Sequence, residues 1–315
     1  MPQLPFVTLD VFTQDRFKGN PLAVVKLPAG AKDESPLPTA RLQQIAAEFN
    51  VSETVFLHER ADTTNNGVPE YRVRIFMTNA ELPFAGHPTI GTAVYALGTL
   101  ARADKGRFIC NAGPIDLELV GKTAQASIPH NVHVHVENPV SRDMVLESQP
   151  ALGRNSVPFS DIEVVSPVKG MNFVCVQLDK LEDLALVQTS NVKLVAKLDA
   201  EWNTGFIGSY FYVITGSAKQ GEDGQASVSV QTRMIEGALE DPATGSAACA
   251  LSSYLALKLE VASIVSFDIV QGAEMGRRSE IGVEITLQQS MNAVEKVVLN
   301  GGAVKVMEGT IEYDG

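Results

Sequence analysis

Alternating apolar and polar residues in the first third of the chain predict strands that are half buried. Residues 6–12 (FVTLDVF) and 22–27 (LAVVKL) have strand composition, and residues 71–77 (YRVRIFM) place apolar side chains at every second position. A further short strand is expected at residues 54–57. Between them the period changes, because apolar residues recur at helical spacing over residues 39–49. An amphipathic helix with Thr39 as its N-cap is therefore expected to end near Asn50.

Two other segments predict helices with almost no charged face. Residues 89–97 (TIGTAVYAL) follow His87 as the expected cap, with Gly98 beyond the end, and residues 247–255 (AACALSSYL) follow Ser246. A helix that is apolar or small on all sides is normally buried. Each segment therefore predicts a central helix with a curved sheet wrapped around it.

The second half of the chain repeats this mixture of strands and helices. Apolar runs predict strands at residues 172–178, 210–215, 227–234 and 282–287. Helices are expected at residues 180–187 and at residues 192–202, the latter because Leu194, Val195 and Leu198 would share one helical face.

The two central helices belong to an internal repeat. Residues 81–89 (ELPFAGHPT) align without a gap with residues 240–248 (EDPATGSAA), and the same offset pairs Tyr95 with Tyr254. A fainter match joins residues 18–27 to residues 169–178. Such self-similarity indicates a duplicated domain.

The expected fold is α/β (α+β), with two pseudo-symmetric halves that each wrap a barrel-like, mostly antiparallel sheet around a central helix. A chain of 315 residues is long enough for two cores. The halves are placed at residues 1–129 and 130–300, with residues 301–315 returning to the first and residues 129–139 crossing between them.

Composition narrows the class of partner. A formal net charge of −12 without a basic cluster argues against nucleic acid and anionic membranes. No apolar run approaches the length of a membrane span, and the first residues do not resemble a signal peptide. Three widely spaced cysteines form no disulfide framework, so a cytoplasmic protein is expected.

The repeat also predicts where a ligand binds. Two helix starts could converge on one small anion in a cleft between the halves, because each start presents backbone N–H groups. Gly86 and Gly245 would let the backbone approach the ligand, with Ala247 adding an N–H, and Thr89 and Ser246 adding hydroxyl groups. His87 and Asp241 occupy the two loops, although either residue taken alone is more often a cap.

Glu53 is the candidate acid/base. It lies between Val51 and the apolar pair Val55 and Phe56, and such neighbours raise a carboxyl pKa by desolvation. The alternative is a structural carboxylate at the protein surface or a helix end. Asp241 is a second candidate for the principal base.

Three other patterns fail as sites. Residues 116–123 end like a phosphate-binding loop, but Asp116 stands where Gly is required, and no dinucleotide fingerprint follows a strand. His130, His133 and His135 lack further ligands at suitable spacing, so a solvated crossover strand is expected there. Neither a metal nor a cofactor is predicted.

Several blocks in order resemble the phenazine-biosynthesis-like (PhzF-like) isomerase family, related to diaminopimelate epimerase. They are residues 17–25, 52–56, 81–89, 240–247, 271–277 and 301–306. The resemblance implies a cofactor-free site between two similar halves, a homodimer, and an acid/base Glu that moves a proton along a cyclic hydroxy-diene carboxylate. By motif that residue is Glu53, supported by His87, Asp241 and Ser246, while Asn20 joins the substrate-binding positions.

The resemblance also bears on mechanism. Related racemases use one thiol at the start of each central helix, but the matching positions here hold Ala85 and Thr244. Carboxylate chemistry is therefore favoured over a two-thiol racemase. The predicted function is a cofactor-independent isomerase that moves a proton on a small cyclic or amino carboxylate. The alternative is a non-catalytic anion-binding or regulatory protein with the same pocket.

Overall fold

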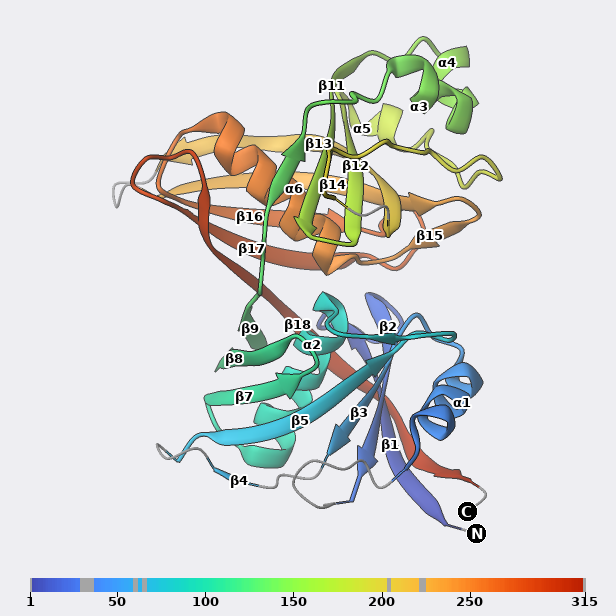
Figure 1. The fold of residues 1–315 in the computed structure, drawn as a ribbon, viewed down its shortest axis with the longest axis vertical. Helices are drawn as coiled ribbons and strands as arrows, with labels where there is room; N and C mark the ends of the chain where they lie inside the picture. Colours follow the sequence, from blue (N-terminus) through green and yellow to red (C-terminus); the bar gives the residue numbers. More distant parts are fainter. Residues whose placement is uncertain are drawn as a thin grey trace. The chain divides into compact units, whose positions relative to one another are not determined.

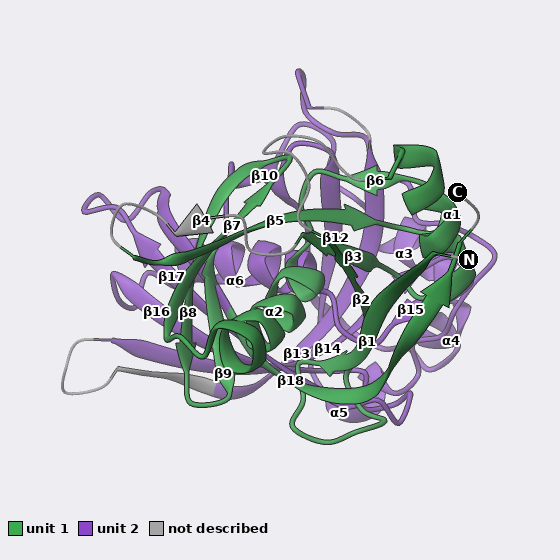
Figure 2. Cartoon of the chain, turned by 90° about the horizontal axis from the view of Figure 1, so that it is seen from below, with its two compact units in different colours: residues 1–127, 300–315 green, residues 128–299 purple. Residues whose placement is uncertain are grey.

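The computed structural model describes residues 2–28, 37–58, 62–63, 67–202, 205–220 and 225–313. The chain divides into two compact units, which Figure 2 draws in different colours. Unit 1 contains residues 1–127 and 300–315, and unit 2 contains residues 128–299. No helix among the described residues has the length and apolar character needed to cross a membrane.

Eight strands of unit 1 close into a ring. Pairing runs from β1 through β2, β3, β5, β7, β8 and β9 to β18, which pairs again with β1. All pairs for which a register is given are antiparallel except β2–β3 and β5–β7. The strands are β1 (Gln3–Val11), β2 (Asn20–Leu27), β3 (Thr54–His58), β5 (Pro69–Phe76), β7 (Lys105–Cys110), β8 (Gly113–Val120), β9 (Thr123–Ser127) and β18 (Val294–Glu312), with the short β4 (Asp62–Thr63) and β6 (Glu81–Leu82) paired to β5.

Helix α2 (Gly86–Tyr95) lies inside this ring, where it contacts strands on several sides (Figure 2). Nine of its ten residues are buried, as the absence of a charged face predicts. Its N-cap is Ala85, so His87 is a residue of the first turn and not the cap. A π-helical segment, η1 (Ala96–Ala101), continues the helix through Gly98, where the sequence had suggested an end.

Helix α1 (Thr39–Phe49) packs its apolar face on the sheet of unit 1. Leu42 and Ile45 join a core with residues of four strands, among them Leu4, Val25 and Phe56. The bounds and the left-handed C-cap at Asn50 confirm the predicted helix, whereas the N-cap is Pro38 and not Thr39. Helix α1 thereby leads the chain into the turn that carries Glu53.

Unit 2 repeats the strand order of unit 1. Pairing runs β10–β11–β12–β13–β14–β16–β17, with β12–β13 and β14–β16 parallel and β15 paired to β14. Helix α6 (Gly245–Leu259) packs on this sheet and is buried along most of its length. The strands are β10 (His133–His135), β11 (Phe159–Val168), β12 (Met171–Leu178), β13 (Phe206–Gln220), β14 (Ala226–Glu236), β15 (Leu239–Asp241), β16 (Ile264–Gln271) and β17 (Ser279–Leu287) (Figure 1).

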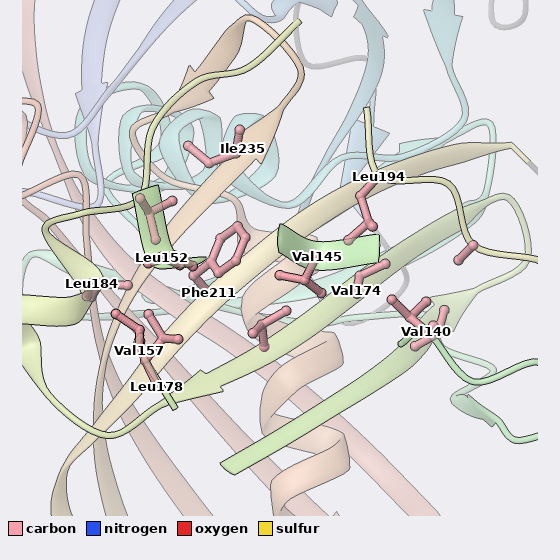
Figure 3. Close-up of a cluster of buried hydrophobic side chains, with 14 of the residues drawn as sticks. Val140, Val145, Leu152, Val157, Val174, Leu178, Leu184, Leu194, Phe211 and Ile235 are labelled. Carbon is pink, nitrogen blue, oxygen red and sulfur yellow. The ribbon is translucent and has the colours of Figure 1, made fainter. Parts of the chain in front are cut away.

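One hydrophobic core cluster of unit 2 contains buried side chains from much of the segment between residues 140 and 198. Side chains from α3 (Arg142–Ser148), α4 (Pro150–Arg154) and α5 (Leu181–Leu184) pack there against strands β11 to β14 (Figure 3). The predicted helix at residues 180–187 is reduced to the single turn α5. The predicted helix at residues 192–202 is wrong: Leu194, Ala196 and Leu198 are buried while Val195 is exposed, the alternation of an extended segment.

The duplicated motifs fold alike. Phe76 pairs with Glu81 in β5–β6, and Ile235 pairs with Glu240 in β14–β15, at the offset seen in the sequence. An Arg–Glu pair braces each hairpin, Arg74 with Glu81 and Arg233 with Glu240, and both are bidentate with N···O distances of 2.6–2.8 Å. The fold class predicted from the sequence is therefore confirmed, including the two similar halves.

Replacing Glu240 by Gln should destabilise the protein by about 3 kcal/mol, because the largely buried Arg233 would lose its charged partner. The equivalent Glu81→Gln should cost about 1 to 2 kcal/mol, since the pair in unit 1 is more exposed. Chemical denaturation measures both losses. Glu308→Gln, which removes an exposed surface pair, is the control and should cause no measurable change. Equal effects of all three substitutions would contradict this account.

Candidate active site

Glu53 lies in the turn between α1 and β3. The next residue, Thr54, is fixed in the ring by pairing with Ala23 of β2 and Phe76 of β5. Its equivalent in the unit 2 ladders is Ser209, which pairs with Val174 and Ile235, so the position before it is Gly208. The repeat therefore carries this carboxyl in unit 1 only.

The carboxyl of Glu53 is desolvated. The side chain keeps 18% of its surface exposed, but Oε2 is buried and accepts no hydrogen bond of normal geometry within the described part of the chain. Burial raises the pKa of Glu53 from 4.5 to about 7, and the Ser52 hydroxyl opposes part of that increase. At neutral pH the group therefore exchanges a proton readily in either direction.

His87 approaches Glu53 from the start of α2. Its Nδ1 lies 3.2 Å from Oε2 of Glu53, and its side chain is 5% exposed. Strand β3 and helix α2 are in contact inside unit 1. This brings Glu53, the residue before β3, close to His87 in the first turn of α2. The structure thus brings together two of the three predicted catalytic residues.

Asn20 joins the same cluster. It is the first residue of β2, it is 1% exposed, and its Oδ1 lies 3.4 Å from the hydroxyl of Ser52. Ser52 was not singled out from the sequence, although it directly precedes Glu53 in the 52–56 block. Asn20, Ser52, Glu53 and His87 form the polar cluster of unit 1.

The start of α2 supplies fewer donors than the sequence suggested. Pro88 has no N–H, and the N–H of Thr89 lies within hydrogen-bonding reach of the Ala85 carbonyl at 3.4 Å. The Thr89 hydroxyl also donates to that carbonyl, at 2.8 Å, so its proton is used within the helix. Gly86 is the first residue of the helix.

In unit 2 the candidate residues surround the start of α6. Asp241 ends β15, Thr244 is the N-cap, and Gly245, Ser246 and Ala247 form the first turn. The Thr244 hydroxyl donates to Oδ2 of Asp241 at 2.6 Å. Asp241 is therefore held by the cap residue and is not itself the cap.

Neither helix start carries a thiol. The N-caps are Ala85 and Thr244, the positions that the sequence comparison assigned to the thiols of related racemases. Cys110, Cys175 and Cys249 are all buried and unpaired. Burial also raises the pKa of the Cys249 thiol to about 12, which leaves it a poor nucleophile.

His133 and His135 of β10 both contact Asp199, a partner that the spacing of the histidines in the sequence did not reveal. Asp199 lies 2.9 Å from Nε2 of His133 and donates its N–H to Nδ1 of His135. His135 is 2% exposed and its Nε2 contacts the Ser166 hydroxyl, so the expected solvated strand is wrong for this residue, whereas His133 remains 34% exposed. The backbone N–H groups of Val136 and Glu137 complete the shell of Asp199. These hydrogen bonds use both ring nitrogens of His135, Nε2 of His133 and both carboxylate oxygens of Asp199.

Comparison with known proteins agrees with this architecture. Residues 9–309 match the family described as phenazine biosynthesis-like protein, PhzC-PhzF. An uncharacterized isomerase of Mesorhizobium japonicum is 30% identical over 97% of this chain and 98% of its own length. The trans-2,3-dihydro-3-hydroxyanthranilate isomerase of Pseudomonas fluorescens is also 30% identical, over 97% of this chain and 98% of its own.

A solved structure shares the fold. The PhzF-family phenazine biosynthesis protein of Bacillus anthracis superposes with a TM-score of 0.76 at 19% identity, over 99% of this chain and 100% of that one. At 19% identity this structural similarity is evidence for the fold alone. From the sequence match, the chain belongs to the phenazine biosynthesis-like (PhzC-PhzF) family, which confirms the resemblance drawn from its motifs and the predicted enzyme class, an isomerase.

Proposed function

We propose that this isomerase moves a proton between two carbons of a small carboxylate, with Glu53 as the acid/base and without a cofactor. The observation that carries the proposal is the desolvated Glu53 carboxyl, with a pKa of about 7, beside His87 at the start of a buried helix. A catalytic group works best when its pKa lies near the working pH.

The proposed reaction needs only one proton and one carboxyl. Ionised Glu53 takes a proton from a C–H carbon that is acidified by conjugation, and the electron pair moves into the conjugated system. The neutral carboxylic acid then returns the proton to another carbon, and the double bond shifts. His87 lies 3.2 Å from Oε2 of Glu53 and is proposed to assist the proton transfer.

The substrate carboxylate is proposed to bind at the helix starts. A helix N-terminus favours an anion through its dipole and its N–H groups. In unit 1 the proposed binding residues are Asn20 and Gly86, with Thr89 lining the start of α2, and in unit 2 they are Gly245, Ser246 and Ala247 at the start of α6. Asp241 is proposed to assist by accepting a hydrogen bond from a donor group of the substrate.

We propose the class of substrate from the name of a relative. The named relative acts on trans-2,3-dihydro-3-hydroxyanthranilate, a cyclic carboxylate that carries an amino and a hydroxyl group. A related cyclic or amino carboxylate is proposed here. The unpaired cysteines are consistent with a cytoplasmic location, and a homodimer is proposed from the family resemblance.

Solvent-deuterium exchange tests the reaction before the substrate is known. Small cyclic and amino carboxylates, with trans-2,3-dihydro-3-hydroxyanthranilate first, are incubated with protein in deuterium oxide, and mass spectrometry follows uptake at carbon. We expect uptake with the native protein and none with Glu53→Gln. Tight binding without uptake for every ligand would instead identify a non-catalytic binding protein.

Glu53→Gln should lower kcat by about 10² to 10⁴ while changing ligand affinity little, because general acid–base assistance is lost. Asp241→Asn should raise KM more than it lowers kcat, since its proposed role is in binding. Steady-state kinetics separates the two effects. The assignment is wrong if Glu53→Gln turns over normally while a folded Asp241→Asn is inactive.

The stability of the protein should also depend on Glu53. Because its pKa is about 7 in the folded state and 4.5 in the unfolded chain, folding favours the protonated form. Its contribution to stability is complete below about pH 4.5 and is lost as the pH rises through about 7, by an amount on the order of 3 kcal/mol. Denaturation at several pH values should show the native protein losing stability relative to Glu53→Gln over this range. Parallel curves would contradict the raised pKa.

A further inference from the structure

Thr244 is an N-cap that does not cap its helix. An N-cap Thr normally accepts a hydrogen bond from the backbone of the first turn. At α6 no such bond forms, and the hydroxyl donates to Oδ2 of Asp241 instead, at 2.6 Å. Something other than the helix therefore fixes the direction of this hydroxyl.

Gln271, the last residue of β16, supplies that direction. Its side chain is fully buried, and its Nε2 donates both to Oγ1 of Thr244 at 3.1 Å and to the carbonyl of Asp241 at 2.8 Å. Its Oε1 accepts the N–H of Thr244 at 3.2 Å. Reversing the amide would oppose two acceptors at the Asp241 carbonyl and two donors at the Thr244 N–H, so these two backbone contacts determine its orientation.

The Tyr210 hydroxyl also holds Gln271 and is itself contacted by Thr232. The buried Tyr210 donates to Oε1 of Gln271 at 3.1 Å, and Thr232 donates to the Tyr210 oxygen at 2.9 Å. The phenol stays protonated because burial raises the pKa of Tyr210 far above neutrality. Donors of Tyr210, Gln271 and Thr244 therefore follow one another toward the Asp241 carboxylate, and bonds aligned in this way strengthen one another. The Thr232 hydroxyl also lies 3.4 Å from the Val270 carbonyl.

We infer that Thr244 and Gln271 are positioning residues, which fix the Asp241 carboxylate as an acceptor of set orientation for a donor group of the substrate. The inference rests on the proposed function for the role of Asp241. Unit 1 has no equivalent arrangement, because Leu82 and Ala85 stand where unit 2 has Asp241 and Thr244. The network is thus a specialisation of one copy of the repeat and not a requirement of the fold.

The test compares two substitutions of Thr244. Thr244→Val removes the hydroxyl and keeps the shape, whereas Thr244→Ser keeps the hydroxyl. Since a hydrogen bond to a charged group is lost, Thr244→Val should lower kcat/KM by about 10- to 100-fold, and Thr244→Ser should stay within about 3-fold of the native protein. Gln271→Glu, which keeps the size but cannot donate to Thr244 when ionised, should resemble Thr244→Val.

A double-mutant cycle separates positioning from general damage. In an Asp241→Asn background, Thr244→Val should cause less than about 3-fold further loss, because the group it positions is already changed. A full additive loss would overturn the inference. If Glu53→Gln retains turnover the proposed function fails, whereas equal activity of Thr244→Val and Thr244→Ser overturns the positioning role and leaves the function intact.

Crystal structures of the two Thr244 variants give a readout that needs no substrate. The Asp241 carboxylate should rotate from its native orientation in Thr244→Val and keep that orientation in Thr244→Ser. An unchanged carboxylate in Thr244→Val would overturn the inference whatever the kinetics show.

Discussion

Each unit has to bury a central helix that has almost no charged face. Helix α2 is enclosed by a closed ring of strands, and α6 is covered by the corresponding sheet of unit 2. Burying the apolar sides of such a helix removes them from water, and the pairing of β18 with β1 closes the ring of described strands in unit 1. The ends of the helix are the places where polar groups can still serve a ligand. The candidate catalytic and binding residues lie at the helix starts and in the segments that reach them.

The duplicated frame carries different chemistry in its two copies. Both copies keep the Arg–Glu pair that braces the hairpin before the helix, which identifies the pair as part of the frame. The residues at the helix starts differ. In unit 1 the desolvated Glu53 lies beside His87, and in unit 2 Asp241 accepts a hydrogen bond from the Thr244 hydroxyl. The shared scaffold therefore carries a different set of polar groups in each unit.

Much of the fold could be predicted from the sequence because its signals are local. The period of α1, the uncharged stretches of α2 and α6, and the repeated motif each specify their structure within a few residues. The helix prediction at residues 192–202 is wrong because the spacing of Leu194, Val195 and Leu198 fits both a helix and an extended chain. Packing against strands β11 to β14 stabilises the extended chain. The pairing of Glu53 with His87 followed from motifs, but the roles of Gln271 and Asp199 depend on contacts between distant strands that no spacing reveals.

The central claim is that Glu53 is held near its titration midpoint at neutral pH. Carbon-13 NMR of protein labelled at the glutamate side-chain carboxyls measures this directly, with Glu53→Gln used to assign the signal. The account predicts a midpoint at about pH 7 for this carboxyl. A midpoint near the ordinary value of 4.5 would contradict it, because the group would then be a solvated carboxylate with no particular fitness for taking and returning a proton.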